Sequence, residues 1–122
     1  MVEYNYLELL KAIRLCSYKQ GYSVIVFAKT GKQAENIFKE AKDAIYNDSD
    51  ELQVLDVCTN RPGAFNITYR NGSIMRFTSL NESARGYKAN CVIYDDVMDS
   101  RDLVSLIERP YMEENNETSR QV

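Results

Sequence analysis

The chain has 122 residues, of which 44% are hydrophobic and 27% charged, the ordinary composition of one folded domain. A chain of this length buries enough surface to fold without disulfides or bound metal, so disorder is excluded for most of it. Its 15 basic and 18 acidic residues give a net charge of −3, which excludes a strongly basic surface for long nucleic acid. The sequence contains no histidine, which excludes histidine-based catalysis and histidine-ligated zinc.

Three cysteines, Cys16, Cys58 and Cys91, lie far apart and form no C-x-x-C pair. We therefore expect free, buried thiols in a reducing compartment. The first residues lack the pattern of a signal peptide, and no run approaches the roughly 18 apolar residues of a membrane span. These features predict a soluble, cytoplasmic protein that does not bind membranes.

The first half of the chain predicts a helix, a buried strand and a second helix. Apolar residues recur at helical spacing from Tyr4 to about Tyr18, and Gly21 follows as a stop. The unbroken apolar run Ser23–Ala28 is typical of a strand that is buried on both faces. Thr30 and Gln33 form a capping box that starts the next helix. One stripe of that helix is apolar: Ala34, Ile37, Phe38, Ala41 and Ile45.

A hairpin is the clearest local signal in the second half. Apolar and polar residues alternate from Phe65 to Tyr69, and Ser73–Phe77 follows after Asn71-Gly72, a pair that favours a type I′ turn. Before the hairpin, the sequence predicts a polar loop at Asn47–Glu51, a strand at Gln53–Cys58 and a turn at Thr59–Gly63.

After the hairpin, a polar loop (Thr78–Asn90) leads to a buried strand, Cys91–Tyr94. Asp99 or Ser100 then caps a last helix, which Pro110 ends. The predicted fold is α/β, with a single mixed, mostly parallel sheet, flanking helices and one β-hairpin. We expect one domain over residues 1–112 and a flexible polar tail over residues 113–122.

The strand Cys91–Tyr94 ends in Asp95 and Asp96, which is the form of a Walker B strand. At the carboxyl edge of a parallel sheet, the first acid of such a strand can hold Mg²⁺ and the second can position a water molecule. The alternative is that a buried strand simply ends in a solvated acidic turn.

The order of these pieces resembles the ATPase core of tailed-phage terminase large subunits, the motors that package DNA. The resembling pieces are VIVFAKTGKQAENIFKEAKDAI, ITYRNGSIMRFTSL, NESARGYKAN, VIYDD and DLVSLIERPYM. They cover roughly residues 7–112. The resemblance implies a degenerate P-loop NTPase fold, and it aligns Arg85-Gly86 with the Arg-Gly loop that precedes the family's Walker B strand.

Several departures from that family argue against ATPase activity. The family has a G-x-x-x-x-G-K-[ST] loop just before the first helix, whereas this sequence reaches that helix directly from Met1, so we expect the loop to be missing. Gly31-Lys32 is no substitute, because Gln33 stands where Ser or Thr is needed. The family's second acid is normally Glu, where this chain has Asp96, and we expect the family's nuclease domain to be missing as well. We therefore expect no enzyme activity from this chain alone.

Five residues are candidates for binding a ligand or partner: Lys29, Thr30, Arg85, Asp95 and Asp96. Lys29 and Thr30 lie at a strand end and a helix N-terminus, a position suited to anions. No cofactor is expected, although Asp95 is a possible ligand for Mg²⁺. The alternative is that Lys29 or Arg85 pairs with Asp95 in a purely structural cluster.

Two hypotheses for function follow. In the first, a small phage or prophage protein reuses the terminase ATPase-like scaffold as a non-catalytic binding module. Its partner would be a host or phage protein or a nucleotide-like ligand, and a role as inhibitor of a host or anti-phage defence protein fits such a module. In the second, the chain is a split or truncated piece of the packaging enzyme, and a second chain supplies the phosphate loop. We also expect a homo-oligomer, because the first helix has an apolar, tyrosine-rich outer face.

Overall fold

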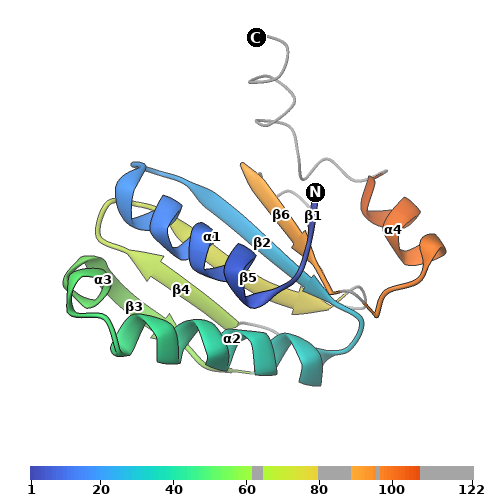
Figure 1. Cartoon of the computed structure of the whole chain (residues 1–122), viewed down its shortest axis with the longest axis horizontal. Helices are drawn as coiled ribbons and strands as arrows, with labels where there is room; N and C mark the ends of the chain where they lie inside the picture. Colours follow the sequence, from blue (N-terminus) through green and yellow to red (C-terminus); the bar gives the residue numbers. More distant parts are fainter. Residues whose placement is uncertain (62–64, 80–88, 96, 108–122) are drawn as a thin grey trace, which may run out of the picture.

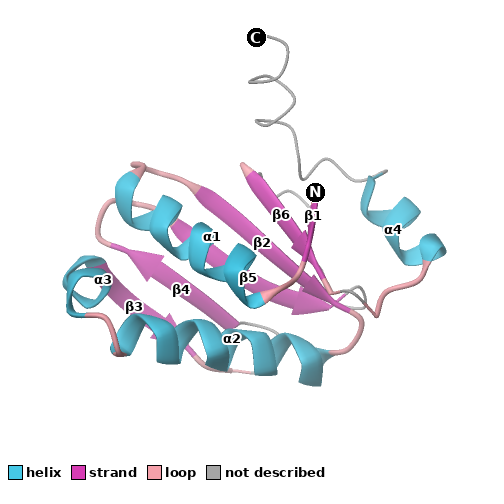
Figure 2. Cartoon of the chain, viewed as in Figure 1, coloured by secondary structure: helices cyan, strands magenta, loops and turns pink. Residues whose placement is uncertain are grey.

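The computed structural model describes residues 1–61, 65–79, 89–95 and 97–107, and within them the chain forms six strands and four helices (Figures 1 and 2). The strands are β1 (Val2–Glu3), β2 (Ser23–Ala28), β3 (Leu55–Thr59), β4 (Phe65–Tyr69), β5 (Ile74–Ser79) and β6 (Cys91–Tyr94). The helices are α1 (Tyr6–Tyr18), α2 (Gly31–Tyr46), α3 (Ser49–Val54) and α4 (Ser100–Ile107).

All six described strands belong to one sheet, in the order β1-β6-β2-β5-β4-β3. The pairings β1–β6, β6–β2 and β2–β5 are parallel, whereas β5–β4 and β4–β3 are antiparallel. Figure 1 shows the arrowheads of β6, β2 and β5 at the same end of the sheet. The predicted class is confirmed: an α/β fold with a single mixed sheet, flanking helices and an antiparallel hairpin.

Strand β2 lies in the middle of the sheet because both of its faces are apolar. Val24, Val26 and Ala28 point into a core beneath the helices, whereas Ile25 and Phe27 point into a second core on the opposite face. All five side chains are fully buried. Such a strand cannot stand at an edge or face water without losing roughly 2 kcal/mol per exposed large side chain.

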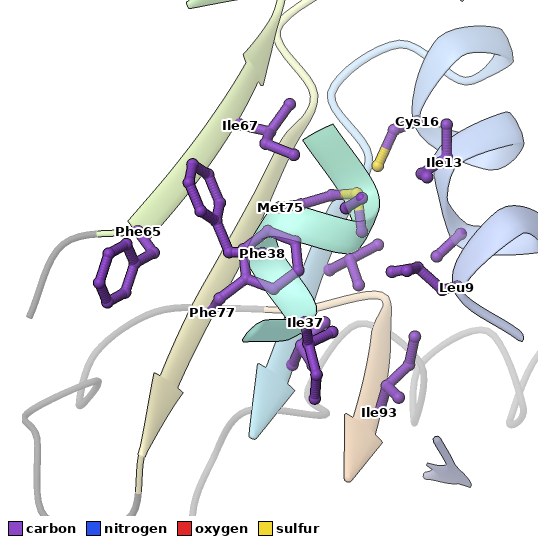
Figure 3. Close-up of a cluster of buried hydrophobic side chains, with 14 of the residues drawn as sticks. Leu9, Ile13, Cys16, Ile37, Phe38, Phe65, Ile67, Met75, Phe77 and Ile93 are labelled. Carbon is purple, nitrogen blue, oxygen red and sulfur yellow. The ribbon is translucent and has the colours of Figure 1, made fainter. Parts of the chain in front are cut away.

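The larger core lies between the sheet and helices α1 and α2 (Figure 3). Leu9 and Ile13 reach it from α1, and Phe38 reaches it from α2 to contact Phe65 and Phe77, with ring centroids 5.4 and 5.6 Å away. The predicted apolar stripe of α2 is buried as expected. The smaller core packs Val92 of β6 with Met98, and Leu103 of α4 lies against it.

The prediction of a polar loop at Asn47–Glu51 is wrong, because helix α3 (Ser49–Val54) begins within it. Asp48 caps α3: its Oδ1 accepts hydrogen bonds from the backbone N–H groups of Asp50 and Glu51, at 3.0 and 3.3 Å. The carboxylate of Glu51 then pairs with Nε of Arg14 on α1, at 3.1 Å. This contact joins α3, a helix of six residues, to α1, and β3 begins at Leu55 directly after α3.

The hairpin is where the sequence predicts it, but its turn is not type I′. Gly72 has a φ of +87°, whereas no non-glycine residue in the described part of the chain has a positive φ, so Asn71 does not take the left-handed conformation that a type I′ turn requires. The loop instead has three residues, Arg70 to Gly72, closed by a bond from Tyr69 N–H to Ser73 O at 2.9 Å. Strand β5 then continues through Ser79, beyond the predicted end at Phe77.

The first and last helices begin close to where the sequence predicts them. The first helix begins at Tyr6 rather than Tyr4, and the short strand β1, which was not predicted, precedes it. Helix α4 begins at Ser100, and Asp99 caps it by accepting a 3.0 Å hydrogen bond from Asp102 N–H. Pro110 and the tail at residues 113–122 lie outside the described residues.

All three cysteines are free, as predicted, but only Cys16 is fully buried, while Cys58 and Cys91 are half-buried. Burial raises the pKa of each thiol, so these cysteines are poor nucleophiles near neutral pH. None of the described helices is long and apolar enough to cross a bilayer.

Candidate functional site

Three neighbouring parallel strands, β1, β6 and β2, end side by side at the carboxyl edge of the sheet. The residues that follow them are tied together through the backbone: Tyr4 N–H donates to Tyr94 O at 2.7 Å, and Asp95 N–H donates to Phe27 O at 2.8 Å. Tyr4, Lys29 and Asp95 therefore stand in one row, at the edge where open α/β sheets bind their ligands.

Asp95 begins a tight turn toward α4. Its side chain is 5% exposed, and Oδ1 accepts a hydrogen bond from Val97 N–H at 3.2 Å. Its backbone carbonyl accepts another from Met98 N–H at 3.1 Å. The bond from Val97 N–H fixes the carboxylate at the strand end, and both bonds stabilise the turn.

Lys29 and Thr30 lie at the same edge, but their polar groups have local partners. Nζ of Lys29 lies 3.9 Å from Oδ2 of Asp102 on α4, and half of the Lys29 side chain is exposed. Oγ1 of Thr30 caps α2 by accepting a bond from Gln33 N–H at 3.1 Å. The pKa of Asp99 is lowered chiefly by the backbone N–H of Asp102, and Lys29 lowers it further. Arg85 and Asp96, the other two candidates, lie outside the described residues.

An open cavity of about 490 Å³ adjoins this edge. One face of α2 forms a wall of it, with residues at helical spacing, and the connection after β1 together with the turn after β6 forms the rest. The lining residues are Tyr4, Asn5, Gln33, Asn36, Ile37, Glu40, Asp95 and Val97. Of the three candidates that the structure describes, Lys29, Thr30 and Asp95, only Asp95 lines the cavity.

Tyr4 and Glu40 connect two walls of the cavity. The phenol hydroxyl of Tyr4 donates a hydrogen bond to Oε1 of Glu40. Burial, and then this bond to the Glu40 carboxylate, raise the pKa of Tyr4 well above its usual value of 10.0, and the charge of Asp95 adds to the effect. Tyr4 therefore stays protonated at neutral pH and keeps its role as the donor.

Among the described residues, the lining of the cavity carries two carboxylates, Glu40 and Asp95, and no lysine or arginine. Such a lining attracts cations and repels phosphates. Asn36 and Gln33 supply amide groups that can donate or accept hydrogen bonds. Ile37 and Val97 supply apolar surface between the polar groups.

The fit of Mg²⁺ to Asp95 depends on a second ligand. Among the described residues, no three histidine, cysteine or acidic side chains lie close enough together to hold a metal ion. Mg²⁺ is commonly held by one or two carboxylates, with substrate phosphates completing its shell. Mg²⁺ at Asp95 therefore stays a prediction that requires a phosphate-bearing ligand.

Sequence reasoning missed Tyr4, Glu40 and Asn36. The polar face of α2 has the pattern of an ordinary solvated face, and Tyr4 fits the apolar pattern of α1. Only the packing of α2 beside the end of β1 gives these residues a common cavity, and no spacing in the sequence encodes that contact.

No protein-family model matches the chain, and neither the search of curated proteins nor the search of solved structures returns a match.

Proposed function

We propose that the chain is a non-catalytic binding module that holds a partner protein at the carboxyl edge of its sheet. In this proposal, the terminase-like order of elements supplies the scaffold, and the cavity beside Asp95 supplies the binding surface. The partner is a host or phage protein in the cytoplasm of a bacterial cell, and inhibition of a defence protein is the role we assign to the complex.

The observation that carries the proposal is the length of two connections. β1 joins α1 through Tyr4 and Asn5 alone, and β2 joins α2 through Lys29 and Thr30 alone. A phosphate-binding loop needs several consecutive backbone N–H groups between strand and helix, together with a lysine that reaches the phosphates. Connections of two residues cannot form such a loop, so they support binding without ATP hydrolysis.

The charge of the cavity supports a protein partner over a nucleotide. A nucleotide brings phosphates close to the strand ends, where this chain presents Asp95 and Glu40. Two carboxylates near a phosphate cost binding energy unless a cation lies between them.

A second candidate function is a piece of the DNA-packaging enzyme, and the position of Asp95 favours it. Asp95 ends a buried parallel strand, as the acid of a Walker B strand does. In this alternative, another chain supplies the phosphate loop, and ATP is hydrolysed only by the two chains together.

The outer face of α1 supports self-association as a further part of the proposal. Tyr6, Leu7 and Tyr18 are 52%, 60% and 75% exposed. A shallow groove of about 500 Å³ runs along this face, lined by Leu7, Leu10, Lys11, Arg14 and Leu15. Burial of this apolar surface against a second copy would stabilise a homo-oligomer.

Thermal unfolding with and without Mg-ATP tests the proposal. A ligand at a hundred times its dissociation constant adds about 2.7 kcal/mol to the stability, which moves the melting temperature of a domain of this size by about 10 °C. We expect no shift with millimolar Mg-ATP. A shift of several degrees that Asp95→Asn removes would contradict the proposal and favour the packaging enzyme.

A further inference from the structure

We propose that α1 packs antiparallel against α1 of a second copy of this chain, and that Glu51 enables this contact by neutralising Arg14 in the interface. This inference rests on the proposed function, because it identifies the surface and the charge pairing behind the proposed self-association. Glu51 acts through Arg14, so it is a positioning residue rather than a contact residue.

The outer face of α1 is a stripe of large side chains that lie three or four residues apart. Its apolar members Leu7, Leu10 and Tyr18 are exposed. The two basic residues of the helix, Lys11 and Arg14, lie between them and line the same groove. Such a stripe can pack on another helix, provided that no charge is buried without a counter-charge.

Both basic residues are paired with carboxylates of their own chain. Nζ of Lys11 lies 3.4 Å from Oε1 of Glu8 on the same helix. Nε of Arg14 lies 3.1 Å from Oε1 of Glu51 on α3, and its guanidinium carbon lies 5.7 Å from the centroid of the Tyr18 ring. The groove is therefore close to neutral. A second copy has the same balance of charge on its own α1, so it fits this face better than a strongly acidic or basic partner does.

Folding alone does not explain a carboxylate at position 51. The Glu51 side chain is 5% exposed, and its Oε1 contacts Arg14 and accepts a hydrogen bond from Oγ of Ser17 at 3.4 Å. Its Oε2 is buried and accepts no hydrogen bond from any residue that the structure describes. A buried oxygen without a hydrogen bond costs stability. The benefit that we assign to Glu51 is the neutral outer face of α1.

An antiparallel arrangement keeps the basic residues of the two copies apart. In a parallel pair, Lys11 would face Lys11 of the second copy, and Arg14 would face Arg14. In an antiparallel pair whose two-fold axis passes between residues 10 and 11, Leu7 faces Arg14 of the second copy and Leu10 faces its Lys11. The aliphatic stems of the basic side chains then pack on leucines, and the two helix dipoles are opposed.

Analytical ultracentrifugation of the full chain tests the inference, with the dimer dissociation constant as the readout. Glu51→Gln keeps the shape of the side chain and removes the charge that neutralises Arg14. We expect the dissociation constant to rise at least about tenfold, because each dimer then holds two Arg14 side chains without their counter-charge. Glu35→Gln is the matched control: it removes one charge from α2, where Glu35 pairs with Lys39, and should leave the constant unchanged.

A double variant separates this role from a loss of folding. Glu51→Gln combined with Arg14→Met removes both charges and keeps a long apolar side chain in the groove. We expect it to dimerise at least as tightly as the wild type, a rescue that a structural defect in Glu51→Gln would not allow.

Oxidative cross-linking tests the antiparallel register. Residue 10 lies beside the proposed two-fold axis, so Leu10→Cys should form covalent dimers under mild oxidation. Residue 7 lies far from its own copy across that axis, so Leu7→Cys should not. The wild type gives the background from the native cysteines. Covalent dimers of Leu7→Cys, or none of Leu10→Cys, would overturn the register.

The outcomes separate this inference from the proposed function. If Glu51→Gln dimerises as tightly as the wild type, or if the double variant stays as weak as Glu51→Gln, the inference is overturned while self-association still stands. Equal weakening by Glu35→Gln would show a general effect of net charge and would also overturn it. A wild type with the mass of one chain would overturn the inference together with self-association. ATP turnover by the chain alone would overturn the non-catalytic function, whatever the dissociation constants.

Discussion

The phenol of Tyr4 donates a hydrogen bond to the carboxylate of Glu40, and this bond joins the connection after β1 to the middle of α2. It closes one side of the cavity beside Asp95. The same bond helps to hold α2 against the N-terminal end of α1. One contact therefore contributes both to the stability of the fold and to the shape of the site.

Tyr4→Phe removes the hydroxyl and keeps the ring. We expect the free energy of unfolding in urea to fall by about 1 kcal/mol at neutral pH, the net value of one hydrogen bond. Tyr6→Phe is the matched control, because the Tyr6 ring is about half exposed at 52%, and it should change stability by less than about 0.5 kcal/mol. Equal effects of the two variants would contradict a role for the Tyr4–Glu40 bond.

The pH dependence of the Tyr4→Phe effect follows from the raised pKa of Tyr4. Because the folded state favours the protonated phenol, the stabilisation is fully present below the usual tyrosine value of 10.0 and is lost as the pH rises above it. The stability difference between the wild type and Tyr4→Phe should therefore shrink in alkaline urea titrations.

Removing the charge of Glu51 should raise the stability of the fold, whereas Tyr4→Phe should lower it. Its side chain is 5% exposed, and burial raises its pKa, against the opposing effects of Ser17 and Arg14. Ionisation of Glu51 thus costs stability as the pH rises above its usual value of 4.5. We expect Glu51→Gln to gain stability relative to the wild type, by up to about 1 kcal/mol, between about pH 4 and pH 7. Urea unfolding at the two pH values measures this difference, and a loss of stability at neutral pH would show that the Arg14 ion pair dominates.

Asp95→Asn separates binding from stability at the edge of the sheet. The amide keeps the shape of the side chain, and its oxygen can still accept the hydrogen bond from Val97 N–H. We expect the melting temperature to change by only about 2 °C, since the shape of the turn is retained. Binding of the partner protein, measured as its retention on the immobilised chain, should meanwhile weaken. Asp102→Asn, which removes the partner of Lys29, is the control and should leave binding intact.

The oligomeric state tests the exposed face of α1. We expect the wild type to scatter light as a dimer or larger assembly at micromolar concentration, and Leu7→Glu to scatter as one chain. Leu52→Glu introduces the same charge at another partly exposed leucine, on α3, and should keep the assembly. A wild-type mass equal to one chain would contradict self-association.

The elements that the sequence predicted well are those whose signal is local. Strand β2 has an unbroken apolar run, and α2 has an apolar stripe with Thr30 as its cap, so each is visible without reference to its neighbours. Strand β6 was found for the same reason.

The elements that the sequence did not predict depend on distant partners. β1 has two residues and exists because Val2 pairs with Ile93 of β6. Asn71 lies in the hairpin turn as its residue type predicts, and its side-chain amide also donates to the backbone carbonyls of Cys16 and Lys19 at the end of α1, at 2.8 and 3.2 Å, a contact that the sequence does not predict. The cavity has the same origin, since Tyr4 and Glu40 meet only after α2 packs on the sheet.

Phosphate release from Mg-ATP by the purified chain tests the central claim most directly, because it asks whether the carboxyl edge performs catalysis or only binds. The wild type and the Asp95→Asn variant are compared at the same concentration, with buffer alone as the baseline. The account predicts that both release phosphate no faster than the buffer. A wild-type rate clearly above the baseline that falls to it in Asp95→Asn would contradict the account and identify the chain as an ATPase.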